Sequence, residues 1–262
     1  MPALGPALRP NQWVSQRTYL SMAAMWAAAV FLLWLVAASG LFPGPVRVAD
    51  ALRTLTAQQG LIGELLTSLT VFAEALVIAA VLSMGLAYLS VVPAIRPVIQ
   101  GLTRARFLSL IGLTFLFTTT FGGGHPLKVS LLVFGISAFF LTAMVDIVAS
   151  VPTERLDHAR TLRMSDWRVV WEVVVLGQMG AALDALRQNA AMGWMMLTMV
   201  EGIARSEGGI GTVLMDLDKH FFLPGIVAVQ GVFLLAGFFQ DAFLAWMKGV
   251  LVPHAALTTA RS

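Results

Sequence analysis

Six long runs of apolar residues, separated by short polar segments, dominate the pattern of this chain. They cover residues 21–42, 65–92, 107–124, 129–145, 173–203 and 221–247. About 20 helical residues, each rising 1.5 Å, cross the ~30 Å hydrocarbon core of a bilayer. The pattern therefore predicts an all-α, polytopic membrane protein with about six transmembrane helices.

Composition supports this fold class and removes several functions. The chain is 58% hydrophobic and 12% charged, whereas soluble domains usually carry about 25% charged residues. It has no cysteine, which excludes disulfides, thiolate metal ligands and cysteine nucleophiles. Its four histidines are scattered and its net charge is only +3. We therefore expect no metal site, no catalytic residue and no nucleic-acid partner.

The Lys and Arg residues predict the orientation in the membrane. Arg9 and Arg17 precede the first apolar run as they would in a signal peptide, but a cleaved signal has an apolar region of only ~7–15 residues. We expect a cytoplasmic segment (1–20), one transmembrane domain (21–250) and a cytoplasmic tail (251–262). With both termini inside, most basic residues are cytoplasmic, as the positive-inside rule requires. Residues 43–64 are then external and predict a short interfacial helix.

The loop 151–172, between the predicted fourth and fifth spans, concentrates charge. Thr153, after Pro152, is suited to begin one helix, and Ser165 is suited to cap a second that begins at Asp166. An apolar edge is expected in the first helix, at Leu156, Ala159 and Leu162. The pattern is consistent with docking onto a soluble partner or with a solvated connector, and periodicity does not separate the two.

Particular residues in and after this loop match a known pattern. Asp157-His158-Ala159 stand at a Glu-Ala-Ala motif, and Arg160-Thr161-Leu162 match a common filling of the next three positions. Ser165, Trp167, the stretch 186–194 and the glycine-rich 207–211 match as well. The chain resembles the permease subunits of ABC importers in the nitrate/sulfonate/taurine group.

The resemblance implies that the loop is a cytoplasmic coupling helix seated on an ABC ATPase subunit. The coupling residues would be Asp157, His158, Ala159, Arg160, Leu162, Arg163, Ser165 and Trp167. ATP and Mg would be bound by the ATPase, because the run 122–128 has no Gly before its Lys and is not a P-loop. The resemblance also implies a second permease copy, an external solute-binding protein and the bacterial inner membrane. The group's solutes are oxyanions, sulfonates and vitamin precursors.

Two positions depart from the pattern of the group. Arg163 occupies a Gly position and Leu176 a Pro position. Glycine would permit a left-handed turn between the two helices, and another residue in that conformation costs ~1–2 kcal/mol. Either Arg163 adopts the turn at that cost or the turn is built differently.

Polar residues within the apolar runs are the candidates for a translocation pathway, because ionisable groups at membrane depth are costly and mark function. They are Glu74, Asp184, Arg187, Gln188, Asn189 and Glu201. Glu74 and Arg187 have similar estimated depths and predict an ion pair between the second and fifth spans. Asp184, one helical turn before Arg187, is a second possible partner. These groups either line a pathway or form a structural pair.

Two further classes of function remain open on sequence alone. A secondary transporter would use Glu74, Asp184 or Glu201 to carry protons or cations, but such folds usually show repeated halves, and no repeat is evident. A membrane enzyme would need paired carboxylates, metal spacing or a Ser/His arrangement, and none stands out. A permease working by alternating access is the leading hypothesis.

Overall fold

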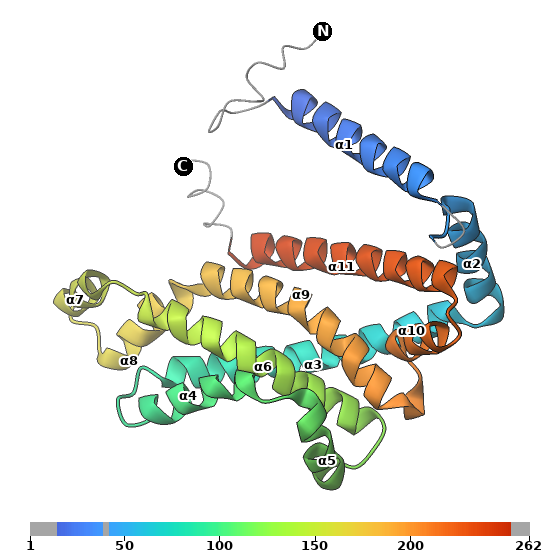
Figure 1. The fold of residues 1–262 in the computed structure, drawn as a ribbon. Helices are drawn as coiled ribbons and strands as arrows, with labels where there is room; N and C mark the ends of the chain where they lie inside the picture. The colour runs from blue at the N-terminus through green and yellow to red at the C-terminus, as the bar shows by residue number, and fades with distance from the viewer. Residues whose placement is uncertain (1–14, 39–41, 253–262) are drawn as a thin grey trace.

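The computed structural model describes residues 15–38 and 42–252, and every regular element in them is a helix (Figure 1). The start of the expected N-terminal segment, 1–14, and nearly all of the expected tail, 253–262, lie outside the described residues. The helices, in chain order, are α1 (Gln16–Ala37), α2 (Pro45–Gln58), α3 (Leu61–Leu89), α4 (Arg96–Thr103), η1 (Arg104–Phe107), α5 (Leu110–Phe121), α6 (His125–Ala149), α7 (Thr153–Thr161), α8 (Asp166–Val169), η2 (Val170–Leu176), α9 (Met179–Ile203), η3 (Arg205–Glu207), α10 (Ile210–Lys219) and α11 (Leu223–Leu251).

Four of these helices, α1, α3, α6 and α11, are long and apolar enough to cross a bilayer. The segment 166–176 and α9 are long and apolar enough only as a pair, bent by 48° at the break between them, so the described residues hold four or five candidate spans. The polytopic all-α class is therefore confirmed, but the count of six is not. The third apolar run, 107–124, forms only the 12-residue α5, which is roughly 18 Å long and shorter than the hydrocarbon core.

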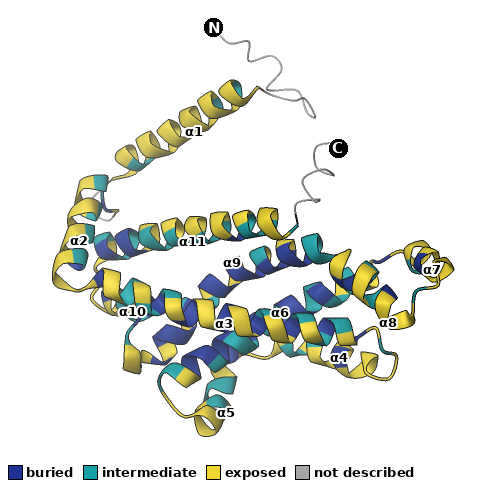
Figure 2. Ribbon diagram, turned by 180° about the vertical axis from the view of Figure 1, so that it is seen from behind, coloured by how far each residue is buried: buried dark blue, intermediate teal, exposed yellow. Residues whose placement is uncertain are grey.

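The core lies where α3, α6 and α9 pack together, and Figure 2 shows the buried residues concentrated on these three helices. Phe72 of α3 stacks on Trp194 of α9 with ring centroids 5.0 Å apart. A Cβ on Gly193 would lie 2.8 Å from the Phe72 ring and 3.0 Å from Ile136 of α6. Glycine at 193 therefore sets the close approach of the three central helices.

The first two helices are peripheral. α1 projects away from the bundle and has no buried residue (Figure 1), so its apolar surface faces outward along its length. The short helix expected within 43–64 is confirmed as α2. It packs Ala51 and Leu55 into a cluster with Val229 of α11, while Arg47 and Asp50 are exposed.

Candidate functional site

The charged loop folds as a helix, a turn and a second helix, with starts at the predicted residues. α7 begins at Thr153 and α8 at Asp166. Ser165 occupies the N-cap in an extended conformation, but its side chain makes no capping hydrogen bond. Its carbonyl accepts the Val169 N–H at 2.9 Å. α7 and α8 lie together at one end of the bundle (Figure 1).

Arg163 adopts the conformation that glycine would provide. Its φ is +57°, in the left-handed region that disfavours residues with a Cβ. The N–H of Met164 reaches back to the Ala159 carbonyl at 3.4 Å, and that of Arg163 to the Arg160 carbonyl at 2.9 Å. The helix thus ends in the left-handed turn that this position of the pattern calls for.

Replacing Arg163 by Gly should therefore stabilise the chain by about 1 kcal/mol, because the strain is removed. Thermal unfolding in detergent should show a rise of roughly 2–4 °C. Arg168→Gly is the matched control: Arg168 is helical and exposed, so this change should lower the stability by about 1 kcal/mol. Equal shifts of the same sign would show that the left-handed conformation is not strained.

The bend at the start of α9 forms without the expected proline. Residues 170–176 form a wide helical turn, in which the Gly177 N–H bonds to the carbonyl of Glu172, five residues earlier, at 3.1 Å. Such insertions bend helices as proline does. The absence of proline at Leu176 therefore leaves the bend in place.

The apolar edge expected on α7 is only partly available to a partner. Ala159 is 5% exposed and packs within the chain, whereas Leu162 is 60% exposed. Helix geometry alone put the two on one face, but α7 is turned so that Ala159 points inward. A groove of about 480 Å³ lies beside it, lined partly by His158, Leu162 and Met164.

The other predicted coupling residues lie at the surface. Arg160 is 3.1 Å from Asp157 and 4.0 Å from Asp166, and all three side chains are more than half exposed. Trp167 is 70% exposed. Surface ion pairs of this kind contribute little to stability, so the loop is free to present these groups to another surface.

The predicted ion pair between Glu74 and Arg187 is wrong. Arg187 forms a two-pronged pair with Asp241 of α11, and the Glu74 carboxylate lies 2.8 Å from the His125 imidazole. Equal depth is not sufficient for a contact, because each side chain must also point toward its partner around the helix axis. Asp184 does not pair with Arg187 either; it accepts from Lys248 of α11 at 2.7 Å.

The remaining pathway candidates are dispersed. Asn189 is 6% exposed and donates to the Ala185 carbonyl of its own helix at 2.8 Å. Gln188 is exposed. Glu201 is fully buried at the far end of α9. Asp184 and Arg187 do not contact each other, but both pair with residues of α11, Asp184 with Lys248 and Arg187 with Asp241.

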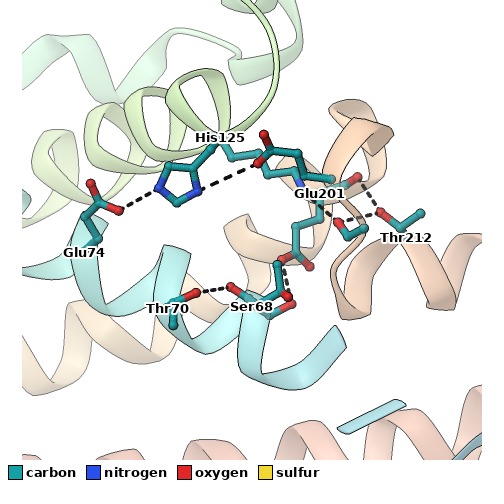
Figure 3. Close-up of polar contacts among 10 residues, drawn as sticks. Ser68, Thr70, Glu74, His125, Glu201 and Thr212 are labelled. Atoms are coloured by element: carbon teal, nitrogen blue, oxygen red, sulfur yellow. Dashed lines mark hydrogen bonds and ion pairs between the residues drawn. The ribbon is translucent and has the colours of Figure 1, made fainter. Parts of the chain in front are cut away.

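A buried polar cluster, which we call the glycine-turn clamp, lies at the end of the bundle away from α7. It comprises Glu64 and Ser68 of α3, Lys128 of α6, Glu201 of α9 and the turn 208–211. Ser68 donates to one Glu201 oxygen at 2.6 Å (Figure 3). The Gly211 N–H donates to the other Glu201 oxygen at 2.8 Å, and Lys128 donates to the Gly208 carbonyl at 2.6 Å.

The turn within the clamp requires glycine. Gly208 and Gly209 have φ of +71° and +107°, and a Cβ on Gly209 would collide with the Glu201 carboxylate. Only glycine adopts such conformations readily. The glycine-rich motif thus has a structural reason: its backbone N–H groups are held by carboxylates from two helices.

Sequence reasoning missed several of these groups. None of Ser68, His125, Lys128, Asp241 and Lys248 was among the residues that the sequence predicted to act at a site. The four-residue spacing of Glu64 and Ser68, one helical turn apart, is the one local signal that they act together. Their partners lie more than 130 residues away in sequence.

Comparison with known proteins agrees with this architecture. The family model described as "Binding-protein-dependent transport system inner membrane component" matches residues 98–249. This chain therefore belongs to that family of permeases. It is a multi-pass transport subunit of the inner membrane rather than an enzyme.

A particular relative is also similar. The chain is 27% identical over 253 residues to the "Taurine transport system permease protein TauC" of Escherichia coli (strain K12), a match that spans 92% of this chain and 91% of the relative. The match includes both the charged loop and the glycine-rich turn, because it runs across nearly the whole length.

Proposed function

We propose that this chain is the permease subunit of an ATP-driven importer for a small sulfonate or related anionic solute, working by alternating access. The observation that carries the proposal is the combination of family membership with an exposed charged helix–turn–helix at one end of a membrane bundle. The relative's taurine substrate supplies the class of solute.

In this proposal the exposed face of α7 and its turn docks onto an ABC ATPase, which binds ATP and Mg. Leu162 is the apolar contact, and Asp157, His158, Arg160, Arg163, Ser165 and Trp167 form its polar and aromatic surround. Because α8 continues through a wide turn into α9, movement of the loop would be transmitted directly to a span that carries Arg187.

A second permease copy completes the pathway in this proposal. The side chains of Arg187, Asp241 and Asp184 are 41–52% exposed although they lie within the spans. Charges facing lipid at membrane depth are costly. Enclosure of these groups between two copies, with water between them, removes that cost and places them along the pathway.

The end of the bundle that holds the glycine-turn clamp faces the outside in this proposal, where a soluble binding protein delivers the solute. Reporter fusions after Gly123 and after Lys219 should then read external, and a fusion after Met164 should read cytoplasmic, because this orientation keeps most basic residues inside. A cytoplasmic signal at either of the first two sites would reverse the orientation or change the number of spans.

The test of the proposed function is reconstitution. The chain is purified with its ATPase in proteoliposomes, and uptake of taurine from a loaded binding protein is measured with and without ATP. Uptake that requires ATP and the binding protein supports the proposal. Uptake that follows a proton or sodium gradient without ATP contradicts it and identifies a secondary transporter.

A further inference from the structure

A groove of about 520 Å³ runs between α9 and α11. One wall is a single face of α9, with Arg187, Trp194 and Thr198 at helical spacing, and the other is a single face of α11, with Gln230, Phe233, Gly237 and Asp241. A Cβ on Gly237 would meet nothing within 4 Å. The groove is therefore open at its centre, next to the charged pair.

The charged groups of the groove lie at one end, and two neutral polar side chains lie at the other. Arg187 and Asp241 form a two-pronged ion pair at one end, and Thr198 and Gln230 lie at the other. Between them Trp194 packs edge-on against Phe233 with centroids 5.4 Å apart, and its indole N–H donates to Gln240. The result is an apolar slot with a charged dipole at one end.

The charged pair is not needed to join the two helices, because a second pair already does so. Lys248 of α11 contacts both carboxylate oxygens of Asp184 of α9 at 2.7 Å. Trp194 and Phe233 add an apolar contact between the same helices. The Arg187–Asp241 pair, with side chains 41% and 47% exposed, instead presents its charges to the groove.

The charge balance of this pair selects the class of ligand. A simple oxyanion that binds Arg187 must draw it away from Asp241, which leaves a carboxylate without compensation beside a second negative charge. A carboxylate left without its partner at membrane depth is unfavourable. A zwitterion avoids this, because its anionic end binds Arg187 while its ammonium binds Asp241, and the net charge of the site stays zero.

We propose that the α9–α11 groove is a solute subsite of the translocation pathway that accepts a small zwitterion, with Arg187 binding a sulfonate or carboxylate and Asp241 binding an ammonium group. Asp241 is then the residue that distinguishes aminosulfonates and amino acids from plain anions. This inference rests on the proposed importer function and names the solute class for it.

Cysteine labelling tests whether water reaches the groove and whether solute binds in it. The chain has no cysteine, so Thr198→Cys introduces one thiol in the permease, and the unmodified permease–ATPase complex serves as the blank. A membrane-impermeant methanethiosulfonate should label Thr198→Cys, and millimolar taurine should slow labelling at least threefold. Isethionate, which carries a hydroxyl in place of the ammonium, should not. Phe239→Cys, 77% exposed but not in the groove, should stay unlabelled because lipid covers it.

The role of Asp241 has its own prediction in the same assay. Asp241→Asn should abolish protection by taurine, because the charge-assisted hydrogen bond to the ammonium group is lost. That loss should lower the affinity for taurine by about tenfold or more. The inference is overturned if Thr198→Cys is unreactive, if taurine gives it no protection, or if isethionate protects it as well as taurine does.

Transport measurements distinguish a failure of the proposed subsite from a failure of the proposed importer function. Gly237→Leu should fill the groove and lower ATP-driven taurine uptake at least tenfold, while Gly231→Leu on the same helix, outside the groove and with equally open space, should leave uptake unchanged. Normal uptake in Gly237→Leu overturns the subsite and leaves the importer standing. Absence of ATP-driven uptake in the unmodified complex removes the importer itself. ATP-driven import of a solute without an ammonium group, but not of taurine, also overturns the subsite.

Discussion

Lys128→Met should destabilise the folded chain by about 3–5 kcal/mol, because it removes one side of a buried charge arrangement and leaves the other uncompensated. Lys128 is fully buried, donates to the Gly208 carbonyl at 2.6 Å and acts electrostatically on Glu201, which is fully buried as well. Thermal unfolding in detergent should fall by on the order of 10 °C.

Two further variants test that explanation. Glu201→Gln alone should also destabilise, because it leaves Lys128 without its carboxylate. The double variant, which removes both charges, should lose less than the sum of the single losses. Lys219→Met is the control: this side chain is 56% exposed, and its loss should change stability by less than about 0.5 kcal/mol. Strict additivity of the two buried changes would show that the clamp is not held by charge.

Leu162→Asp should uncouple the chain from its ATPase. Leu162 is the large apolar side chain that α7 leaves exposed, at 60%, and in the docked complex it would be buried. Placing a charge there costs roughly 3 kcal/mol, about a hundredfold in affinity. Co-purification of the ATPase and solute-stimulated ATP hydrolysis should both fall by roughly a hundredfold. The permease should still fold and insert.

The controls for docking distinguish a lost contact from a broken loop. Leu162→Met keeps the apolar contact and should retain the ATPase. Ala159→Glu should lower thermal stability as well as docking, because Ala159 is already buried within the chain. Full coupling in Leu162→Asp would contradict the docking role and show that the loop is a solvated connector.

Local features of this fold could be predicted because they depend on neighbours in the sequence. The lengths of the apolar runs identify α3, α6 and α11 as spans, because crossing a bilayer requires only a continuous run of sufficient length. The starts of α7 after Pro152 and of α8 after Ser165 were predicted correctly because each depends on a few neighbouring residues. The strain at Arg163 was anticipated as one of two alternatives, and its φ of +57° decides between them.

The length of an apolar run overestimated the length of the helix where turns interrupt the run. The third apolar run is continuous in composition, but the turn through η1 and the left-handed Gly122 limit α5 to 12 residues. Glycine conformations and short turns are set by the packing around them, so the apolar pattern alone overestimates this helix.

Ion-pair partners required the tertiary structure. Depth along a helix is readable from sequence, so Glu74 and Arg187 were expected to meet. Which neighbour each side chain faces depends on rotation and stagger among packed helices, and these bring His125 to Glu74 and Asp241 to Arg187.

The sequence by itself determined the membrane class, the charged helix–turn–helix and the glycines of the 207–211 turn, because each is encoded in a short window of residues. Only the tertiary structure decided that Lys128 is a buried donor rather than a loop charge, and that four charges on α9 and α11 form two pairs beside an open groove. The physical reason is that burial and pairing arise between helices, from contacts that join residues about 50 to 130 positions apart.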